Sequence, residues 1–276
     1  MIAPIQKYLF CLSILFFTAC GSTPPPKVEA PVAPPPVAQE PTTTPPEQPV
    51  EPEPVMSPEL AELHEAMRVG NIEAIQTKAR QIIDKDPTGA DAVVAYRALA
   101  EMALETSPAT ARLYIERAAE RAPNDPDVFF VFGKIAHAQA NDDEALKHFE
   151  TAANADPQNA SACLASAAIL LTYLDIEQAL ERADCAMKRQ PDRCDVVAMH
   201  ADTRFASKRF EDAAASYEKY LDLSCPVSED VLRRLAKLHE THLSNAKRAC
   251  EVYGILAELR PDNPDYAASR DYQCGQ

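Results

Sequence analysis

Apolar residues recur at helical spacing through most of the chain, and the alternation typical of strands is almost absent. Residues 126–159 carry two apolar stripes of this kind, one on each side of a polar turn. The stripes are formed by Phe129, Phe132, Gly133 and Ala136 and by Ala145, Phe149 and Ala152. The first stripe follows the i, i+3, i+4, i+7 pattern of one helix face. Asn141 lies in the turn, where it can cap the next helix, and Pro157 ends that helix because proline lacks an N–H. The segment therefore predicts two antiparallel helices, and small residues at Gly133 and Ala145 let them approach closely.

Proline and alanine each mark a period of about 34 residues along the chain. The prolines at the ends of successive segments are Pro87, Pro123, Pro157, Pro191 and Pro261. The alanines twelve residues before each mark are Ala111, Ala145, Ala179, Ala213 and Ala249. The one mark missing from the proline series falls at Cys225, next to Pro226. Because two residue types report the same period, the sequence predicts one helical unit repeated along the chain.

This pattern resembles the tetratricopeptide repeat (TPR), a 34-residue helix–turn–helix unit. The match is most complete from Pro126 to Cys225, whereas Ile75 stands at the usual alanine position of the first unit, and no unit has the family's common tryptophan. The resemblance implies an all-α fold, a right-handed superhelix (α-solenoid) of about six stacked units over residues 58–261. Residues 262–276 are predicted to form a capping helix and tail.

The N-terminal residues 1–19 have a different pattern. Lys7 precedes a 12-residue apolar stretch, Tyr8–Ala19, which is too short to span a bilayer comfortably. A basic start followed by a short apolar stretch is typical of a secretory signal peptide. We therefore expect export of the chain.

The end of this signal, Phe17-Thr18-Ala19-Cys20-Gly21, resembles the lipobox of bacterial lipoproteins, although leucine is usual where Phe17 stands. The resemblance implies that Cys20 is lipidated and becomes the first residue of the mature chain. In that family an Asp after the lipidated Cys tends to retain the protein at the inner membrane, and Gly21 stands there instead. The resemblance thus implies an outer-membrane, lipid-anchored protein that faces the periplasm. The alternative is a plain secretory signal with an ordinary Cys20.

Residues 20–57 form a proline-rich segment between the signal and the repeats. Residues 21–57 contain 13 Pro and five Glu, with Lys27 as their one basic residue, and show no apolar periodicity. Proline favours extended polyproline II, and like charges extend a chain further. We expect a disordered tether that reaches about 115 Å at most and lifts the repeats off the membrane. The alternative is a proline-rich docking ligand.

The net charge of −15 matters mainly by what it excludes. An acidic chain without a basic stripe repels phosphates, so no nucleic-acid partner is expected. The sequence has no run of about 18 apolar residues, which excludes a multi-span membrane protein. No cofactor is expected, because six Gly are too few for a glycine-rich phosphate loop and Cys-x-x-Cys is absent.

Six cysteines remain once Cys11 leaves with the signal and Cys20 is lipidated, and an even number in an exported chain suggests disulfides. Antiparallel neighbours meet when the midpoint between two cysteines lies in a turn. That criterion selects the pairs Cys163–Cys185, Cys194–Cys225 and Cys250–Cys274. Two alternatives stay open: a Cys185–Cys194 bond across the Pro191 turn with Cys163 free, and buried free thiols throughout.

A catalytic or metal site has little support in the sequence. His239-Glu240-Thr241-His242 invites comparison with the zinc protease motif, which needs its histidines at i and i+4 so that both share one helix face. Here the spacing is i+3, so we interpret His239 and His242 as solvated residues near a helix end. We expect no enzyme activity, and the rival from another class is a metal- or thiol-dependent enzyme built on these histidines and nearby cysteines.

A groove for a protein partner is the better-supported site. The TPR resemblance implies that a partner segment lies on the concave face, which the first helix of each unit lines. By register that face includes Tyr96, Phe130, Lys134, His137, Leu164, Leu171, Asp202 and Phe205. Aromatic and aliphatic side chains interleaved with a few charges suit a bound peptide or helix. The alternative is that several are core, above all Leu164 and Leu171, because the apolar run 163–174 indicates a helix buried on all sides.

The sequence therefore predicts a non-catalytic scaffold or assembly factor for another envelope protein. Its layout resembles pilotin-type TPR lipoproteins, which implies a secretin-like channel as partner. A scaffold for cell-wall enzymes is the second interpretation, because a long tether could bring the repeats near peptidoglycan, and a purely structural spacer is the third.

Overall fold

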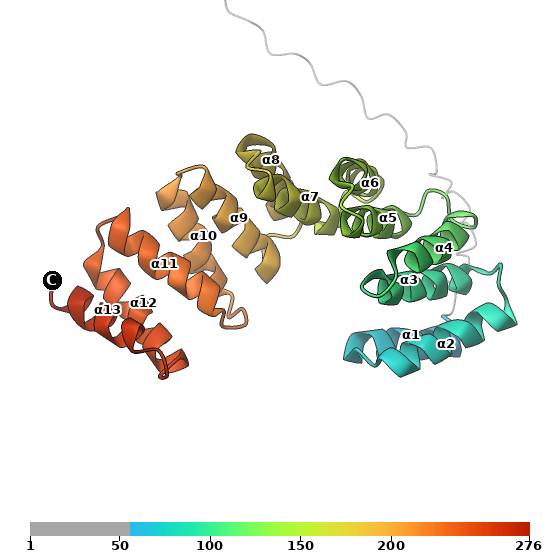
Figure 1. Ribbon diagram of the computed structural model, residues 1–276, viewed down its shortest axis with the longest axis horizontal. Coiled ribbons are helices and arrows are strands. Elements are labelled where there is room, and N and C mark those ends of the chain that lie inside the picture. Colours follow the sequence, from blue (N-terminus) through green and yellow to red (C-terminus); the bar gives the residue numbers. More distant parts are fainter. Residues whose placement is uncertain (1–55) are drawn as a thin grey trace, which may run out of the picture. The chain divides into compact units, whose positions relative to one another are not determined.

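The computed structural model describes residues 56–276, which form thirteen α-helices and no strand within that range (Figure 1). The predicted signal peptide, the predicted lipidation site at Cys20 and nearly all of the proline-rich segment lie outside the described residues. In the described part no helix is both long and apolar enough to cross a membrane.

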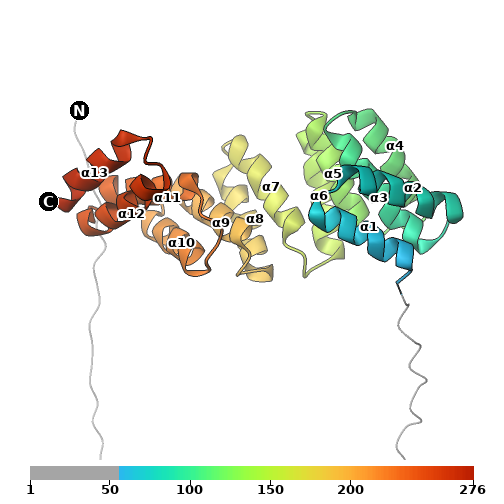
Figure 2. The ribbon, with the colours of Figure 1, turned by 90° about the horizontal axis from the view of Figure 1, so that it is seen from below.

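The helices form six consecutive pairs followed by one single helix, and the pairs succeed one another in chain order (Figures 1 and 2). The first helices are α1 (Pro58–Val69), α3 (Ala90–Leu104), α5 (Pro126–Ala138), α7 (Ser161–Thr172), α9 (Cys194–Ala206) and α11 (Glu229–Thr241). The second helices are α2 (Ile72–Lys85), α4 (Pro108–Ala119), α6 (Asp142–Ala155), α8 (Ile176–Arg189), α10 (Phe210–Asp222) and α12 (Ala246–Leu259). The single helix is α13 (Pro264–Cys274). The all-α solenoid of six helix pairs predicted from the repeat is confirmed.

The alanine period corresponds to one structural position, the fourth residue of each second helix. Its occupants, all buried, are Ile75, Ala111, Ala145, Ala179, Ala213 and Ala249. Every alanine in this series has no exposed surface, whereas Ile75 retains 8%. A small side chain suits this buried position between the two helices of a pair, so alanine recurs there in five of the six pairs.

The helices α5 and α6 pack closely at Gly133. A Cβ atom added to Gly133 would lie 2.5 Å from Cε1 of Phe149, whose side chain is almost completely buried. The apolar stripe on α5 is wider than the sequence indicated: besides the predicted Gly133 and Ala136, its buried members include Val128, Val131 and Ile135.

The aromatic members of that stripe are only half-buried. Phe129 and Phe132 stack against the ring of His148 on α6, with ring centroids 6.4 and 5.2 Å apart. They therefore cover the edge of the α5–α6 interface, while the smaller branched side chains fill its centre.

The helix ends follow local signals. The side-chain oxygen of Asn141 accepts a hydrogen bond from the N–H of Glu144 and caps α6, as its place in the predicted turn suggested. Four second helices end two residues before the prolines of the period, at Lys85, Ala155, Arg189 and Leu259. The exception is α4, which ends at Ala119, four residues before Pro123.

The turn inside most pairs contains one residue with left-handed backbone. Gly70 has φ of 68°, and the non-glycine residues in equivalent turns are Ala140, Leu174, Lys208 and Ser244. At Leu174 the following N–H, from Asp175, donates to the carbonyl of Leu170, which closes the end of α7. Five of the six turns within pairs therefore share this αL geometry, but only one has the residue type that adopts it without strain.

Candidate functional site

The first helices of the pairs form one face of the solenoid, which we call the first-helix face (α1, α3, α5, α7, α9 and α11). A hollow of about 460 Å³ opens on it between α3, α5 and α7, and we call it the α3–α7 groove. Its lining residues are Leu104, Glu105, Lys134, His137, Ala138, Phe149, Ala165, Ala168, Ile169 and Thr172. Most of these side chains are apolar, so the groove offers an apolar floor with a few polar groups around it.

Lys134 sits at the polar side of the α3–α7 groove. Its Nζ donates a hydrogen bond of 2.8 Å to Oε1 of Glu101 on α3 and lies 5.8 Å from the ring centroid of Phe130. The ring of Phe130 packs against Phe149, with centroids 5.5 Å apart. The lysine therefore ties α3 to α5 and covers an aromatic pair at the same time.

His137 belongs to a small hydrogen-bonded group beside the groove. Its Nδ1 contacts Oδ1 of Asp142, and the hydroxyl of Tyr173 donates to Oδ2 of the same carboxylate at 2.6 Å. The hydrogen bond with His137, and then that with Tyr173, holds the pKa of Asp142 below its usual value. The same contact raises the pKa of Tyr173. These bonds join the α5–α6 turn to the end of α7 and so fix one wall of the groove.

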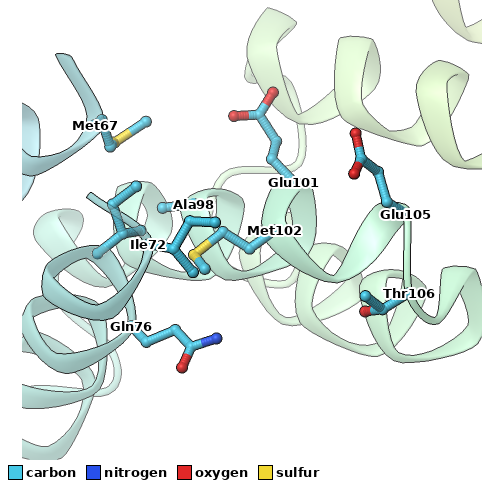
Figure 3. Close-up of a pocket in the computed structure, with 9 residues that line it drawn as sticks. Met67, Ile72, Gln76, Ala98, Glu101, Met102, Glu105 and Thr106 are labelled. Carbon is cyan, nitrogen blue, oxygen red and sulfur yellow. The ribbon is translucent and has the colours of Figure 1, made fainter. Parts of the chain in front are cut away.

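A second hollow of about 480 Å³, the α1–α3 pocket, adjoins the groove (Figure 3). Its lining residues are Met67, Ile72, Ile75, Gln76, Ala98, Glu101, Met102, Glu105 and Thr106. Figure 3 shows Glu101 and Glu105 projecting from the same side of α3, whereas Met102 turns toward Met67 and Ile72. Ile72 is 65% exposed, which is unusual for so large an apolar side chain.

The predicted contact residues fall into different environments. Lys134 and His137 line the α3–α7 groove, and Phe130 is half-buried beside it. Tyr96 is only 9% exposed and packs in the core under the guanidinium of Arg121, so it belongs to the core and not to an accessible face.

The helix that carries Leu164 and Leu171 is not buried on all sides. Both leucines are half-buried, but Ala168 between them is exposed and lines the groove. The prediction from the apolar run that α7 is buried on all sides is therefore wrong for one side of the helix, which faces the groove.

Asp202 and Phe205 lie farther along the first-helix face. Asp202 accepts hydrogen bonds from the hydroxyl of Tyr217 and the guanidinium of Arg234, so it is engaged within the fold. Burial, and then the negative charge of Asp202, raises the pKa of Tyr217 well above its usual value. Phe205 lines a hollow of about 360 Å³ whose cations, Arg233, Arg234 and Lys237, are all paired with carboxylates.

Eight of the ten residues that line the groove were not among the predicted contact residues, and Leu104, Glu105 and Ala168 are three of these eight. The 34-residue period contains a signal for Leu104 and for Ala168. Leu104, Ala138 and Thr172 are spaced 34 residues apart and all line the groove, and Ala168 lies midway between Lys134 and Asp202 in the same register. Glu105 follows α3 directly and has no equivalent in the pattern.

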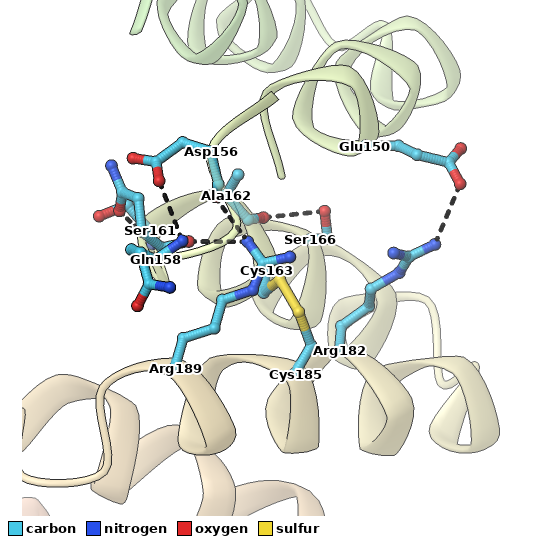
Figure 4. Close-up of a disulfide and its surroundings, with 11 residues drawn as sticks. Glu150, Asp156, Gln158, Ser161, Ala162, Cys163, Ser166, Arg182, Cys185 and Arg189 are labelled. Atoms are coloured by element: carbon cyan, nitrogen blue, oxygen red, sulfur yellow. Dashed lines mark hydrogen bonds and ion pairs between the residues drawn. A yellow bond between two sulfur atoms is a disulfide. The ribbon is translucent and has the colours of Figure 1, made fainter. Parts of the chain in front are cut away.

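The structure pairs the six cysteines as Cys163–Cys185, Cys194–Cys225 and Cys250–Cys274, with Cα–Cα distances of 6.0, 5.7 and 5.1 Å. These distances lie in the range of ordinary disulfides. Figure 4 shows the first bond joining α7 to α8, near Arg189, which donates to the carbonyls of Asp156 and Asn159. Each bond closes a stretch of the C-terminal half, and the first one ties α7, which lines one side of the α3–α7 groove, to α8.

The two histidines of the HETH segment do not share a site, and the interpretation of His239 as solvated is wrong, because its side chain is buried. Nε2 of His239 is 3.3 Å from Oε1 of Glu218, and the ring of His242 stacks on Phe210 with centroids 3.8 Å apart. Burial alone would raise the pKa of Glu218, but hydrogen bonds and charge from Arg248, together with His239, lower it below the usual value. Within residues 56–276, no group of three or more His, Cys, Asp or Glu side chains is arranged to hold a metal ion.

Comparisons with known proteins agree on the architecture. PilF of Pseudomonas aeruginosa superposes with a TM-score of 0.64 at 18% identity, over 79% of this chain and 96% of that one. The chain has the tetratricopeptide-repeat fold. PilW, described as a widely conserved type IV pilus biogenesis factor, superposes with a TM-score of 0.63 at 19% identity, over 76% and 96% of the two chains. YrrB, described as a TPR protein with an unusual peptide-binding site, gives 0.53 at 14% identity, over 70% and 97%.

These identities establish the TPR fold alone. No protein-family model and no curated protein sequence matches the chain.

Proposed function

We propose that the protein is a non-catalytic scaffold or assembly factor that binds a peptide or helix of another protein in the α3–α7 groove. The observation that carries this proposal is a hollow of about 460 Å³ on the first-helix face with an apolar floor and charged groups around it. Apolar surface provides the binding energy in such a site, and the few polar groups orient the bound segment. A TPR protein with a peptide-binding site and a TPR pilus biogenesis factor among the structures of the same fold support this class of function.

The proposal extends to where the protein works. The lipobox-like residues before Cys20 and the proline-rich segment 20–57 support a lipid-anchored protein at the outer membrane that faces the periplasm. Paired cysteines suit that oxidising compartment. The partner is then another envelope protein. A secretin-like channel is the first candidate, on the resemblance of the layout to pilotin-type TPR lipoproteins, and PilW, a pilus biogenesis factor, has the same fold. A cell-wall enzyme is the second candidate partner, which the length of the proline-rich segment favours.

A groove-blocking variant tests the binding mode. Ala168→Trp places a large side chain in the α3–α7 groove from an exposed helix position, and Ala215→Trp on α10 is the matched control on an exposed second-helix position. Crosslinking in cells followed by mass spectrometry is expected to recover the same envelope partner with the wild-type chain and Ala215→Trp but not with Ala168→Trp. Equal recovery from all three would place the binding surface elsewhere.

A second experiment tests the anchor. Cys20→Ser removes the thiol that would carry the lipid, so the chain is expected to move from the membrane fraction to the soluble fraction and to lose incorporation of a labelled fatty acid. A wild-type chain that incorporates no fatty acid would refute lipidation without affecting the groove.

A further inference from the structure

The α3–α7 groove and the α1–α3 pocket are adjacent hollows that share a lining residue. Glu105 lines both hollows, and the hydrogen bond between Lys134 of the groove and Glu101 of the pocket bridges the border between them. An occupant that follows the first-helix face therefore passes from one apolar hollow to the other across the carboxylates of α3.

The border between the two hollows carries one unpaired negative charge, that of Glu105. Glu101 lies in the last turn of α3 and Glu105 at its C-cap, where the helix dipole already places partial negative charge, and the last turn contains no basic residue. Lys134 neutralises Glu101. Glu105 is exposed, and its carboxylate has no ion-pair partner within residues 56–276. An unpaired carboxylate at this end of α3 destabilises the helix, and a cation supplied by a bound partner would neutralise it.

We propose that this surface selects a segment of another protein in which a lysine or arginine is flanked on both sides by apolar residues. The apolar residues enter the two hollows, and the cation lies against Glu105. This inference rests on the proposed function, since it names the chemistry of the segment that the same face binds.

Charge excludes the two occupants that belong to this chain. The proline-rich segment 21–55 carries five Glu against one Lys, so it is repelled by the carboxylates of α3. A second copy of a chain with net charge −15 is repelled in the same way. A basic and apolar segment from a different protein is complementary to the surface in both respects.

A displayed library of random 16-residue peptides, selected against the purified full chain, tests this specificity. The enriched peptides are expected to share a lysine or arginine between apolar residues. One of them, synthesised with a fluorescent label, is then titrated with the wild-type chain and three variants: Glu105→Lys, Ala168→Trp, and Glu258→Lys on α12 as the control with an equal charge change at an exposed site. Circular dichroism verifies that each variant is folded.

The expected result is a loss of affinity of about tenfold for Glu105→Lys and about fivefold when the central lysine of the peptide becomes glutamine, with no change for Glu258→Lys. Ala168→Trp abolishes binding. If Ala168→Trp abolishes binding but neither charge change matters, or if the enriched peptides are acidic or uncharged, the basic specificity is wrong and the groove remains the binding site. If no peptide is enriched, or if Ala168→Trp has no effect, the specificity and the groove are both refuted.

Discussion

Single residues hold the left-handed turns of the repeats at an energetic cost. Leu174 has φ of 59° and is 78% exposed, so its side chain contributes little packing to offset the strain of that backbone. Such a conformation costs an L-residue roughly 1–2 kcal/mol, which glycine avoids. Because non-glycine residues occupy four of these five turns, the turns lower the stability of the folded chain.

Leu174→Gly is expected to increase the free energy of unfolding by about 0.5–1 kcal/mol, because the relief of strain exceeds the entropy that glycine loses on folding. Gly70→Ala is the reverse experiment. Gly70 has φ of 68° and open space around its Cβ position, so alanine adds strain without a clash and is expected to lower stability by about 1 kcal/mol. Denaturant unfolding measures both changes, and a destabilised Leu174→Gly would contradict the argument.

His200 introduces a pH dependence that is separate from the carboxylates. Its Nδ1 lies 2.9 Å from Oγ of Ser216 and its Nε2 3.2 Å from Oδ1 of Asp184, and Arg204 and Asp212 face the same ring. Burial, and then the charge of Arg204, lowers the pKa of His200 below 6.5. The unfolded chain therefore binds a proton at this residue before the folded chain does, so stability is full above about pH 6.5 and falls as the pH decreases.

The melting temperature is thus expected to fall between pH 7 and pH 5, and His200→Gln is expected to reduce that fall. His64→Gln, on the exposed side of α1, is the control for removal of a histidine. Thermal unfolding at a series of pH values measures the effect. An unchanged slope in His200→Gln would assign the pH dependence to other groups.

At the scale of helices, the close approach of α5 and α6 depends on Gly133. A methyl group there would overlap the ring of Phe149, which the surrounding core holds in place. Overpacking of this kind costs about 1–3 kcal/mol, while replacing a mid-helix glycine by alanine gains about 1 kcal/mol in helix propensity.

Gly133→Ala is therefore expected to lower the free energy of unfolding by about 1 kcal/mol overall. Gly254→Ala is the matched control within α12, because the nearest atom to its added Cβ, Cδ of Arg270, is 3.9 Å away. That substitution is expected to stabilise the chain by about 0.5–1 kcal/mol. Opposite signs for two identical substitutions would isolate the packing contribution, whereas two stabilising results would show that α5 and α6 can separate at little cost.

At the scale of the whole molecule, successive repeats are tied together by arginines at the ends of second helices. Nε of Arg121 donates to the carbonyl of Pro87 at 2.6 Å, and Arg189 donates to the carbonyl of Asn159 at 2.9 Å. Each bond joins one pair to the loop after the preceding pair. The repeats thus share hydrogen bonds as well as apolar contacts, which couples the stability of neighbours.

The disulfides apply a further constraint to the C-terminal half. Mass spectrometry after thiol blocking without reduction is expected to find Cys163–Cys185, Cys194–Cys225 and Cys250–Cys274 as linked peptides in the exported protein. Each closes a loop of 22 to 31 residues, worth roughly 3.5 kcal/mol on the chain-entropy model, so reduction is expected to lower the melting temperature. Six blocked thiols, or a Cys185–Cys194 peptide, would contradict this pairing.

Most of the architecture could be predicted because its determinants are local. The alanine at the fourth position of a second helix, the cap at Asn141 and the proline after each unit all act within one 34-residue repeat. The cysteine pairs could be proposed from the same register, since residues at equal distances from a turn face each other. Tyr96 could not be assigned in this way, because the core cluster that buries it includes Val128 and Val131 of α5, which belongs to the next repeat.

The sequence alone determined the period, the helix pairs and their ends, because hydrogen bonds and apolar contacts within a single repeat are sufficient to specify them. Only the tertiary structure decided where the first-helix face is open. The α3–α7 groove is built from four helices of three repeats, and its volume depends on how far α5 and α7 stand apart, which no single repeat encodes. The position of Glu105 is decided in the same way: helix packing places its unpaired carboxylate at the edge of both hollows.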